Sequence, residues 1–203
     1  WPQVKDLLLN DVKSFKIGGT ENFENFVNAV IDKKAFDRIV SYIEYIKTSP
    51  DAEILIGGGY DSSKGYFIEP TVVLTKNAQY RTMCEEIFGP VLTIYIYDDA
   101  DFDATLKLID STSEYALTGA IISQDKAAIA HTLKVLEHAA GNIYINDKPT
   151  GAVVNQQPFG GGRASGTNDK AGSYINLLRW VSPRTIKENL NPPTDYRYPF
   201  MDK

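Results

Sequence analysis

The chain has 203 residues, of which 43% are hydrophobic and 23% are charged, and its formal net charge is -5. This length allows one sizeable domain, or a domain with an arm, and the composition is close to that of soluble globular proteins. The charge is spread without a basic cluster, which argues against nucleic acid as a partner, and no apolar run reaches the roughly 20 residues of a membrane span.

The first part of the chain predicts two helices followed by short strands. Apolar residues recur at helical spacing after Pro2, and this helix is expected to end before Gly18. Asp32 can cap a second helix, which Pro50 ends. The apolar face of this second helix consists of Phe36, Ile39, Val40, Ile43 and Ile46. Short strands are then expected at 53–56, 66–68 and 71–74.

The second part of the chain alternates strands with helices. The expected elements are a strand at 91–97, a helix with Phe102, Leu106 and Ile109 on one face, a strand at 119–123, a helix with Ile129, Leu133 and Leu136, and a strand at 142–146. This alternation predicts an α/β fold in which helices cover a mostly parallel sheet.

After this sheet, residues 147–172 form a long Gly- and Ser-bearing segment without periodicity. Its interior, QQPFGGGRASG, holds aromatic and charged residues at fixed places, which favours a functional loop over a linker. A short helix near 174–178 and an extended stretch at 180–186 then lead into a polar tail.

The segment CEEIFGP allows two interpretations. It can be the C-terminal turn of a helix, with solvated acids and with Phe88 in the core. Alternatively, a carboxylate held beside the Gly-Pro corner accepts hydrogen bonds from two sugar hydroxyls, while Phe88 forms a wall against a flat ring. The local residues leave both interpretations open.

The glycine-rich segment FGGGRASG does not fit the dinucleotide motif G-x-G-x-x-G. We expect Gly160, Gly161 and Gly162 to let the backbone turn tightly against another part of the protein. Upstream, residues 150–152 (TGA) offer backbone N–H groups on a loop, which suit a carboxylate.

The remaining reactive side chains do not predict a catalytic or metal site. Cys84 is the only cysteine, which excludes an internal disulfide, and its acidic neighbours are expected to raise its thiol pKa. His131 and His138 lie seven residues apart on an expected helix, where surface positions are more common than metal ligands. We therefore assign no catalytic residue and no metal ligand.

Taken together, EEIFGPVL, GAIIS, GNIYIN and QQPFGGGRASG resemble, in this order and spacing, the C-terminal half of the NAD(P)-dependent aldehyde dehydrogenase superfamily, over about residues 1–187. The segment INDKPTGAVVNQQPFGGGRASGTNDKAG is similar to the branch that oxidises L-glutamate γ-semialdehyde, the mitochondrial 1-pyrroline-5-carboxylate dehydrogenases of proline catabolism.

The resemblance implies roles for particular residues. Glu86 would accept hydrogen bonds from the nicotinamide ribose of NAD, and Phe88 would position the nicotinamide. Gly151 and Ala152 would anchor the α-carboxylate of the amino-acid semialdehyde substrate. Phe159 would be one wall of an aromatic box around its aliphatic chain.

The resemblance also implies an organisation. Residues 1–179 would be an incomplete catalytic region and residues 180–203 an oligomerisation strand with a tail, in a homodimer of the mitochondrial matrix, or otherwise of the cytoplasm. In the family, the nucleophilic Cys, the oxyanion Asn, the general-base Glu and the cofactor domain precede the matched part. Since the chain starts at Trp1 without a Met, we expect an internal start, an inactive isolated chain and exposed apolar surface that favours self-association.

Two alternatives remain open. The chain could act as a binding or interaction protein built on a borrowed fold, or its family could act on another class of aldehyde. Determining the native N-terminus would separate the first alternative from the enzyme. A comparison of glutamate γ-semialdehyde with alkyl aldehydes would test the second.

Overall fold

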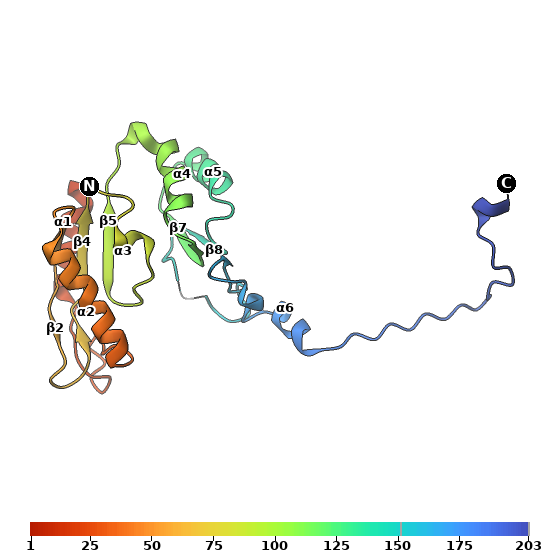
Figure 1. Ribbon diagram of the computed structural model, residues 1–203, viewed down its shortest axis with the longest axis horizontal. Coiled ribbons are helices and arrows are strands. Elements are labelled where there is room, and N and C mark those ends of the chain that lie inside the picture. The colour runs from red at the N-terminus through yellow and green to blue at the C-terminus, as the bar shows by residue number, and fades with distance from the viewer. Residues whose placement is uncertain (151, 203) are drawn as a thin grey trace.

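The computed structural model describes residues 1–150 and 152–202. It consists of two neighbouring α/β units, each a small sheet with its helices, and a C-terminal tail that runs away from them (Figure 1). The two units are called the first and the second layer below. The first layer contains a sheet in the order β1 (Ala52–Ile56), β4 (Thr71–Thr75) and β5 (Val91–Tyr95). The second layer is built on the pair β7 (Thr118–Ile121) and β8 (Asn142–Ile145).

The strand pairings confirm the predicted parallel arrangement in part. The pair β4–β5 is parallel with Thr71 opposite Val91, and the pair β7–β8 is parallel with Thr118 opposite Asn142. The edge strand β1 runs antiparallel to β4. The sheet of the first layer is therefore mixed.

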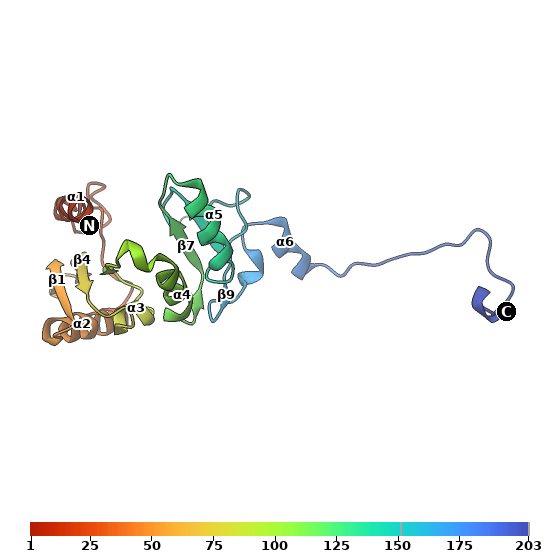
Figure 2. The same ribbon diagram turned by 90° about the horizontal axis from the view of Figure 1, so that it is seen from above.

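Helices α1 (Pro2–Ser14) and α2 (Lys33–Thr48) lie on opposite faces of the first sheet (Figure 2). The Asp32 carboxylate accepts a hydrogen bond from Ala35 N at 2.7 Å and caps α2, as predicted. This helix buries Phe36, Ile39, Tyr42, Ile43 and Ile46. In contrast, α1 has no buried residue, and it leaves Val4 and Leu7 exposed.

The second layer carries two longer helices, α4 (Phe102–Thr112) and α5 (Lys126–Val135), which contact each other. Leu106 and Ile129 supply their buried apolar side chains. The shorter elements are β2 (Tyr60–Asp61), β3 (Phe67–Ile68), α3 (Arg81–Cys84), β6 (Tyr115–Ala116), β9 (Gly162–Arg163) and α6 (Tyr174–Leu177), and the short 3₁₀ helices are Asp99–Asp101, Asn168–Lys170, Leu178–Trp180 and Pro199–Asp202.

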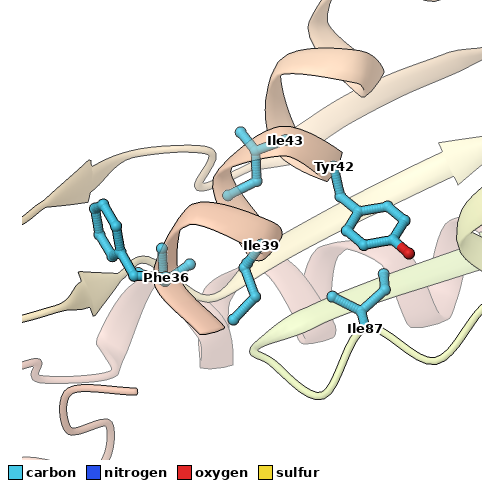
Figure 3. Packing of buried hydrophobic residues seen from close by; sticks show 6 residues of the cluster. Phe36, Ile39, Tyr42, Ile43 and Ile87 are labelled. Carbon is cyan, nitrogen blue, oxygen red and sulfur yellow. The ribbon is translucent and has the colours of Figure 1, made fainter. Parts of the chain in front are cut away.

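The main core lies between α2 and the first sheet. Its buried residues are Phe36, Ile39, Tyr42, Ile43, Ile68 and Ile87 (Figure 3). Ile87 comes from the loop between α3 and β5, and it is 6% exposed, whereas the adjacent Phe88 is 78% exposed. The interpretation that places Phe88 in the core is therefore wrong, because Ile87 occupies that place.

Two segments differ from the sequence-based expectation. Residues 147–172 contain β9 and a 3₁₀ turn, because backbone and side-chain hydrogen bonds organise this segment without any apolar periodicity. At 180–186 the described chain has no strand, so the predicted oligomerisation strand is not confirmed. Within the described residues no helix is long and apolar enough to cross a membrane.

Candidate functional site

The loop between α3 and β5 is anchored at its centre and exposed at both sides of that anchor. Ile87 is buried under α2, and Arg38 Nη2 donates a hydrogen bond to the Ile87 carbonyl oxygen at 3.0 Å. Glu86 and Phe88, which flank Ile87, are both exposed. The loop thus presents a carboxylate and an aromatic ring to the outside from a fixed backbone.

The backbone of this loop is strained at Phe88, whose φ is 55°. A bulky residue in the left-handed region costs about 1–3 kcal/mol and persists only where its surroundings impose it. The next residue is packed closely against α2, because a Cβ on Gly89 would lie 2.5 Å from Ile39 Cδ1. Strain of this kind is typical of sites where a side chain must point in one direction.

The adjacent acids of EEIFGP have different surroundings. Glu85 turns back to α2, where the Tyr42 hydroxyl donates to its Oε2 at 2.5 Å. Arg81 Nε donates to both carboxylate oxygens of Glu85, at 3.1 and 3.2 Å, and its guanidinium lies 4.5 Å from the centre of the Tyr42 ring. The Glu86 carboxylate has no hydrogen-bond partner among the described residues, so it is free to accept hydrogen bonds from a ligand.

These contacts shift the pKa values of the groups involved. The hydrogen bond from Tyr42, followed by that from Arg81, lowers the pKa of Glu85 below its ordinary value. The same hydrogen bond to Glu85, followed by burial, raises the pKa of the Tyr42 hydroxyl. Each shift favours the pair in which Glu85 is ionised and Tyr42 is neutral.

We expect Glu85 to stabilise the fold only above acid pH. Its lowered pKa makes its contribution present above the ordinary carboxyl pKa of about 4.3, and this contribution is lost as the pH falls through the lower folded-state pKa. The raised pKa of Tyr42 makes stability depend on pH in the opposite direction. The contribution of Tyr42 to the free energy of unfolding is present below about pH 10, and it is lost as the pH rises through the folded-state pKa.

Thermal melts of the wild type and of Glu85→Gln, recorded from pH 3 to pH 9, would measure this dependence. The difference in melting temperature should be largest near neutral pH and should shrink as the pH falls below the ordinary carboxyl pKa of about 4.3. A difference that stays constant over this range would contradict the prediction.

A second group of candidate residues lies in the loop after β8. Ala152 and Phe159 line one small cavity of about 200 Å³. The other residues that line it are Val153, Val154, Gln157, Ala171 and Gly172. The structure therefore brings together two of the predicted substrate residues, while the third, Gly151, lies outside the described residues.

Hydrogen bonds across the loop hold the walls of this cavity. Phe159 N donates to the Ala171 carbonyl at 2.9 Å, and Asn155 N donates to the Gly172 carbonyl at 2.7 Å. These hydrogen bonds join residues 155 and 159 to residues 171 and 172 of the same loop. They therefore fix the backbone from which the Phe159 side chain extends.

Asn142, the first residue of β8, is a structural residue of this site that the motif analysis missed. Its Nδ2 donates to the Pro158 carbonyl at 3.0 Å, and its Oδ1 accepts from Gly160 N at 3.1 Å. Asn142 therefore clamps the backbone on both sides of Phe159. The signal for it was a polar residue at the start of the apolar strand NIYI.

Two of the three glycines in this run lie close against other parts of the backbone, which agrees with the prediction in part. A Cβ on Gly160 would overlap the Thr167 carbonyl oxygen, and a Cβ on Gly161 would lie 2.8 Å from the Ala116 carbonyl oxygen. Gly162 has open space around its Cβ position. The run therefore packs against the returning part of its own loop and against β6.

Residues 113–116 connect the two candidate regions. Ser113 Oγ donates to the Cys84 carbonyl at 3.2 Å, directly before Glu85. Two residues later, β6 pairs antiparallel with β9, and Ala116 N donates to Ser165 Oγ at 3.0 Å. The loop with Glu86 and the glycine-rich loop are thus attached to the same short segment, although Phe88 does not line the cavity of Ala152 and Phe159.

The other reactive side chains have ordinary surroundings. Cys84 is a half-buried free cysteine whose Sγ lies 3.7 Å from Gln79 Oε1. His131 Nε2 lies 2.6 Å from Asp103 Oδ1, and His138 Nε2 lies 3.4 Å from Glu137 Oε1. Residues 1–150 and 152–202 contain no group of His, Cys, Asp and Glu side chains that could hold a metal ion.

Comparison with protein families and curated proteins gives a consistent result. The family model described as "Aldehyde dehydrogenase family" matches residues 1–186. The chain is 62% identical over 201 residues to the mitochondrial delta-1-pyrroline-5-carboxylate dehydrogenase of Dictyostelium discoideum, and this match covers 99% of the chain and 36% of that protein. The human protein of the same name is 52% identical over 202 residues, with the same coverage.

Solved structures agree with this similarity. The structure of the delta-pyrroline-5-carboxylate dehydrogenase of Mycobacterium tuberculosis bound with NAD has a TM-score of 0.86 at 46% identity, covering 99% of this chain and 36% of that chain. Betaine aldehyde dehydrogenase of Staphylococcus aureus in complex with NAD+ has a TM-score of 0.70 at 28% identity, covering 81% and 32%. The chain spans 36% of the length of the curated relatives named above.

Proposed function

This chain belongs to the aldehyde dehydrogenase family, and from that premise we propose that it acts as the C-terminal part of an NAD-dependent dehydrogenase. The proposed enzyme oxidises L-glutamate γ-semialdehyde, formed from 1-pyrroline-5-carboxylate, to glutamate in proline catabolism. The observation that carries the proposal is the strained loop that holds Glu86 and Phe88 outward beside the buried Ile87.

The residues present fit the nicotinamide end of NAD. An exposed carboxylate without a protein partner suits the vicinal hydroxyls of a ribose, and an exposed phenyl ring suits a flat heterocycle. Bound NAD supplies the hydride acceptor, whereas the protein supplies binding and orientation. In this proposal Glu86 accepts the ribose hydroxyls and Phe88 restricts the position of the nicotinamide ring.

The size and the lining of the cavity at Ala152 and Phe159 suit a small aliphatic substrate. Its volume of about 200 Å³ is below that of pockets for drug-sized ligands, which begin at roughly 300 Å³. Valine and phenylalanine side chains would contact the methylene groups of the semialdehyde. Backbone N–H groups at Gly151 and Ala152 would bind its α-carboxylate.

The reactive centre is proposed to lie in another part of the enzyme. Family chemistry requires a cysteine thiolate that attacks the aldehyde and a base that activates water. Within residues 1–150 and 152–202, the Cys84 thiol has no histidine or cationic hydrogen-bond partner, and its Sγ donates to the amide oxygen of Gln79 at 3.7 Å. We therefore propose that the 203 residues alone bind without turnover.

Location and assembly follow from the same proposal. The relatives from Dictyostelium discoideum and Bos taurus are named mitochondrial, which supports the mitochondrial matrix. We propose a boundary between residues 179 and 180, with dimerisation through 180–186. Trp180, Val181 and Ile186 support this role, because each is more than half exposed on a segment that leaves the body (Figure 1).

Replacement of Glu86 by Gln in the complete enzyme tests the proposed function. We expect the dissociation constant for NAD to rise about tenfold, because a charge-assisted hydrogen bond is worth about 1.5–3 kcal/mol and Gln retains part of it. Calorimetric titration with NAD measures this change. The Michaelis constant for the semialdehyde should stay within about twofold, and an unchanged affinity for NAD would refute the assignment of Glu86.

A further inference from the structure

We propose that Arg38 and Tyr42, on α2, are positioning residues for the cofactor: they hold residues 85–90 so that Glu86 and Phe88 face the ligand. This inference rests on the proposed function of Glu86 and Phe88. It adds a second region of the chain, more than 40 residues away in sequence, to the cofactor site.

The two residues act on the loop from one face of the helix. Arg38 and Tyr42 are four residues apart, a spacing that places side chains next to each other on a helix. Arg38 Nη2 holds the main chain through the Ile87 carbonyl at 3.0 Å. One turn further along, the Tyr42 hydroxyl holds the side chain of Glu85 at 2.5 Å.

These contacts separate the roles of the adjacent acids. Tyr42 and Arg81 occupy the carboxylate oxygens of Glu85, so this side chain stays turned toward α2. Because Glu85 is held on one side and Ile87 is buried on the other, the backbone at Glu86 is fixed from both directions. Glu86 is thereby kept exposed, and it does not compete with Glu85 for Arg81.

The helix that carries these contacts is firmly packed. Ile39 and Ile43, between and beside Arg38 and Tyr42, are both 0% exposed (Figure 3). A group on such an element is held more precisely than a group on a free loop. Phe88 has a strained backbone with a φ of 55°, and such a conformation persists only where the packing and hydrogen bonds around it hold it in place.

Two substitutions that remove the hydrogen-bond donors test the proposal in the complete enzyme. Tyr42→Phe removes only the hydroxyl, while Arg38→Met removes the guanidinium donor and retains an unbranched, shorter apolar side chain. Each is expected to raise the dissociation constant for NAD roughly three- to tenfold, the range for one lost hydrogen bond. Arg38→Lys retains a cationic donor. The increase that it causes in the logarithm of the dissociation constant for NAD should be at most half of the increase caused by Arg38→Met.

Two further readouts distinguish positioning from a general structural role. Without NAD, amide hydrogen exchange of residues 85–91 should accelerate in Tyr42→Phe, while exchange in β7 and β8 stays as in the wild type. With NAD, the Michaelis constant for the semialdehyde should be unchanged. Tyr45→Phe is the matched control, because it removes the same atom from the same helix and leaves the Tyr42–Glu85 hydrogen bond in place.

The outcomes separate this inference from the proposed function. If Glu86→Gln weakens NAD binding but Tyr42→Phe and Arg38→Met do not, the positioning role is wrong and the cofactor site stands. If Glu86→Gln has no effect, the cofactor site itself is wrong. Equal losses in Tyr42→Phe and Tyr45→Phe, or exchange that accelerates throughout the protein, would also overturn the positioning role.

Discussion

Gly160→Ala is expected to disrupt the loop at 152–172 and to destabilise the protein by about 3 kcal/mol, at the upper end of the usual cost of overpacking. The added methyl group would overlap the Thr167 carbonyl oxygen, and a backbone atom cannot move aside as the end of a side chain can. The displacement would also break the hydrogen bond from Gly160 N to Asn142 Oδ1, which holds the chain next to Phe159.

The run of glycines contains its own control. Gly162 has nothing within 4 Å of its Cβ position, so Gly162→Ala should change stability by no more than about 0.5 kcal/mol. Chemical denaturation of both variants measures the difference. If the chain belongs to the enzyme proposed above, only Gly160→Ala should raise the Michaelis constant of the complete enzyme for the semialdehyde. Equal stabilities of the two variants would show that the loop is not packed as described.

Ile39→Ala is expected to cost about 2–5 kcal/mol of stability, the range for removing a large buried aliphatic side chain. Ile39 is 0% exposed and belongs to the core cluster with Ile43 and Ile87, and its Cδ1 lies 2.5 Å from the position that a Cβ on Gly89 would occupy. Its loss would therefore open a cavity both in the core of the first layer and directly under residues 85–90.

Ile31→Ala is the matched control for this substitution. Ile31 is 92% exposed just before α2, so its truncation should cost at most about 0.5 kcal/mol. Urea denaturation monitored by circular dichroism compares the two variants with the wild type. A cost below about 1 kcal/mol for Ile39→Ala would show that the α2 core contributes less than its burial implies.

Local patterns predicted the elements with the strongest periodicity. The apolar spacing in 36–46 and the cap at Asp32 predicted α2, and the structure confirms both. The strands around 53–56, 71–74 and 91–97 were also predicted, although the last ends at Tyr95. Patterns of this kind can be detected because burial of one face imposes a fixed period on residues close in sequence.

Other predictions are still untested. The extended stretch at 180–186 would need a second chain to form the proposed strand pairing, and the described chain shows none. The self-association expected from exposed apolar surface is consistent with the exposure of Val4, Leu7 and Trp180. Light scattering of the chain in solution would measure it.

The sequence by itself determined the family, the main helices and strands, and the segment in which the proposed cofactor residues lie. Only the tertiary structure decided which acid of EEIFGP is free, because Glu85 is held by Tyr42, a residue 43 positions away. In the same way, it showed that Ile87 rather than Phe88 enters the core, and that Asn142 holds the loop at Pro158 and Gly160. Such contacts depend on how separate elements meet in space, and no local periodicity records them.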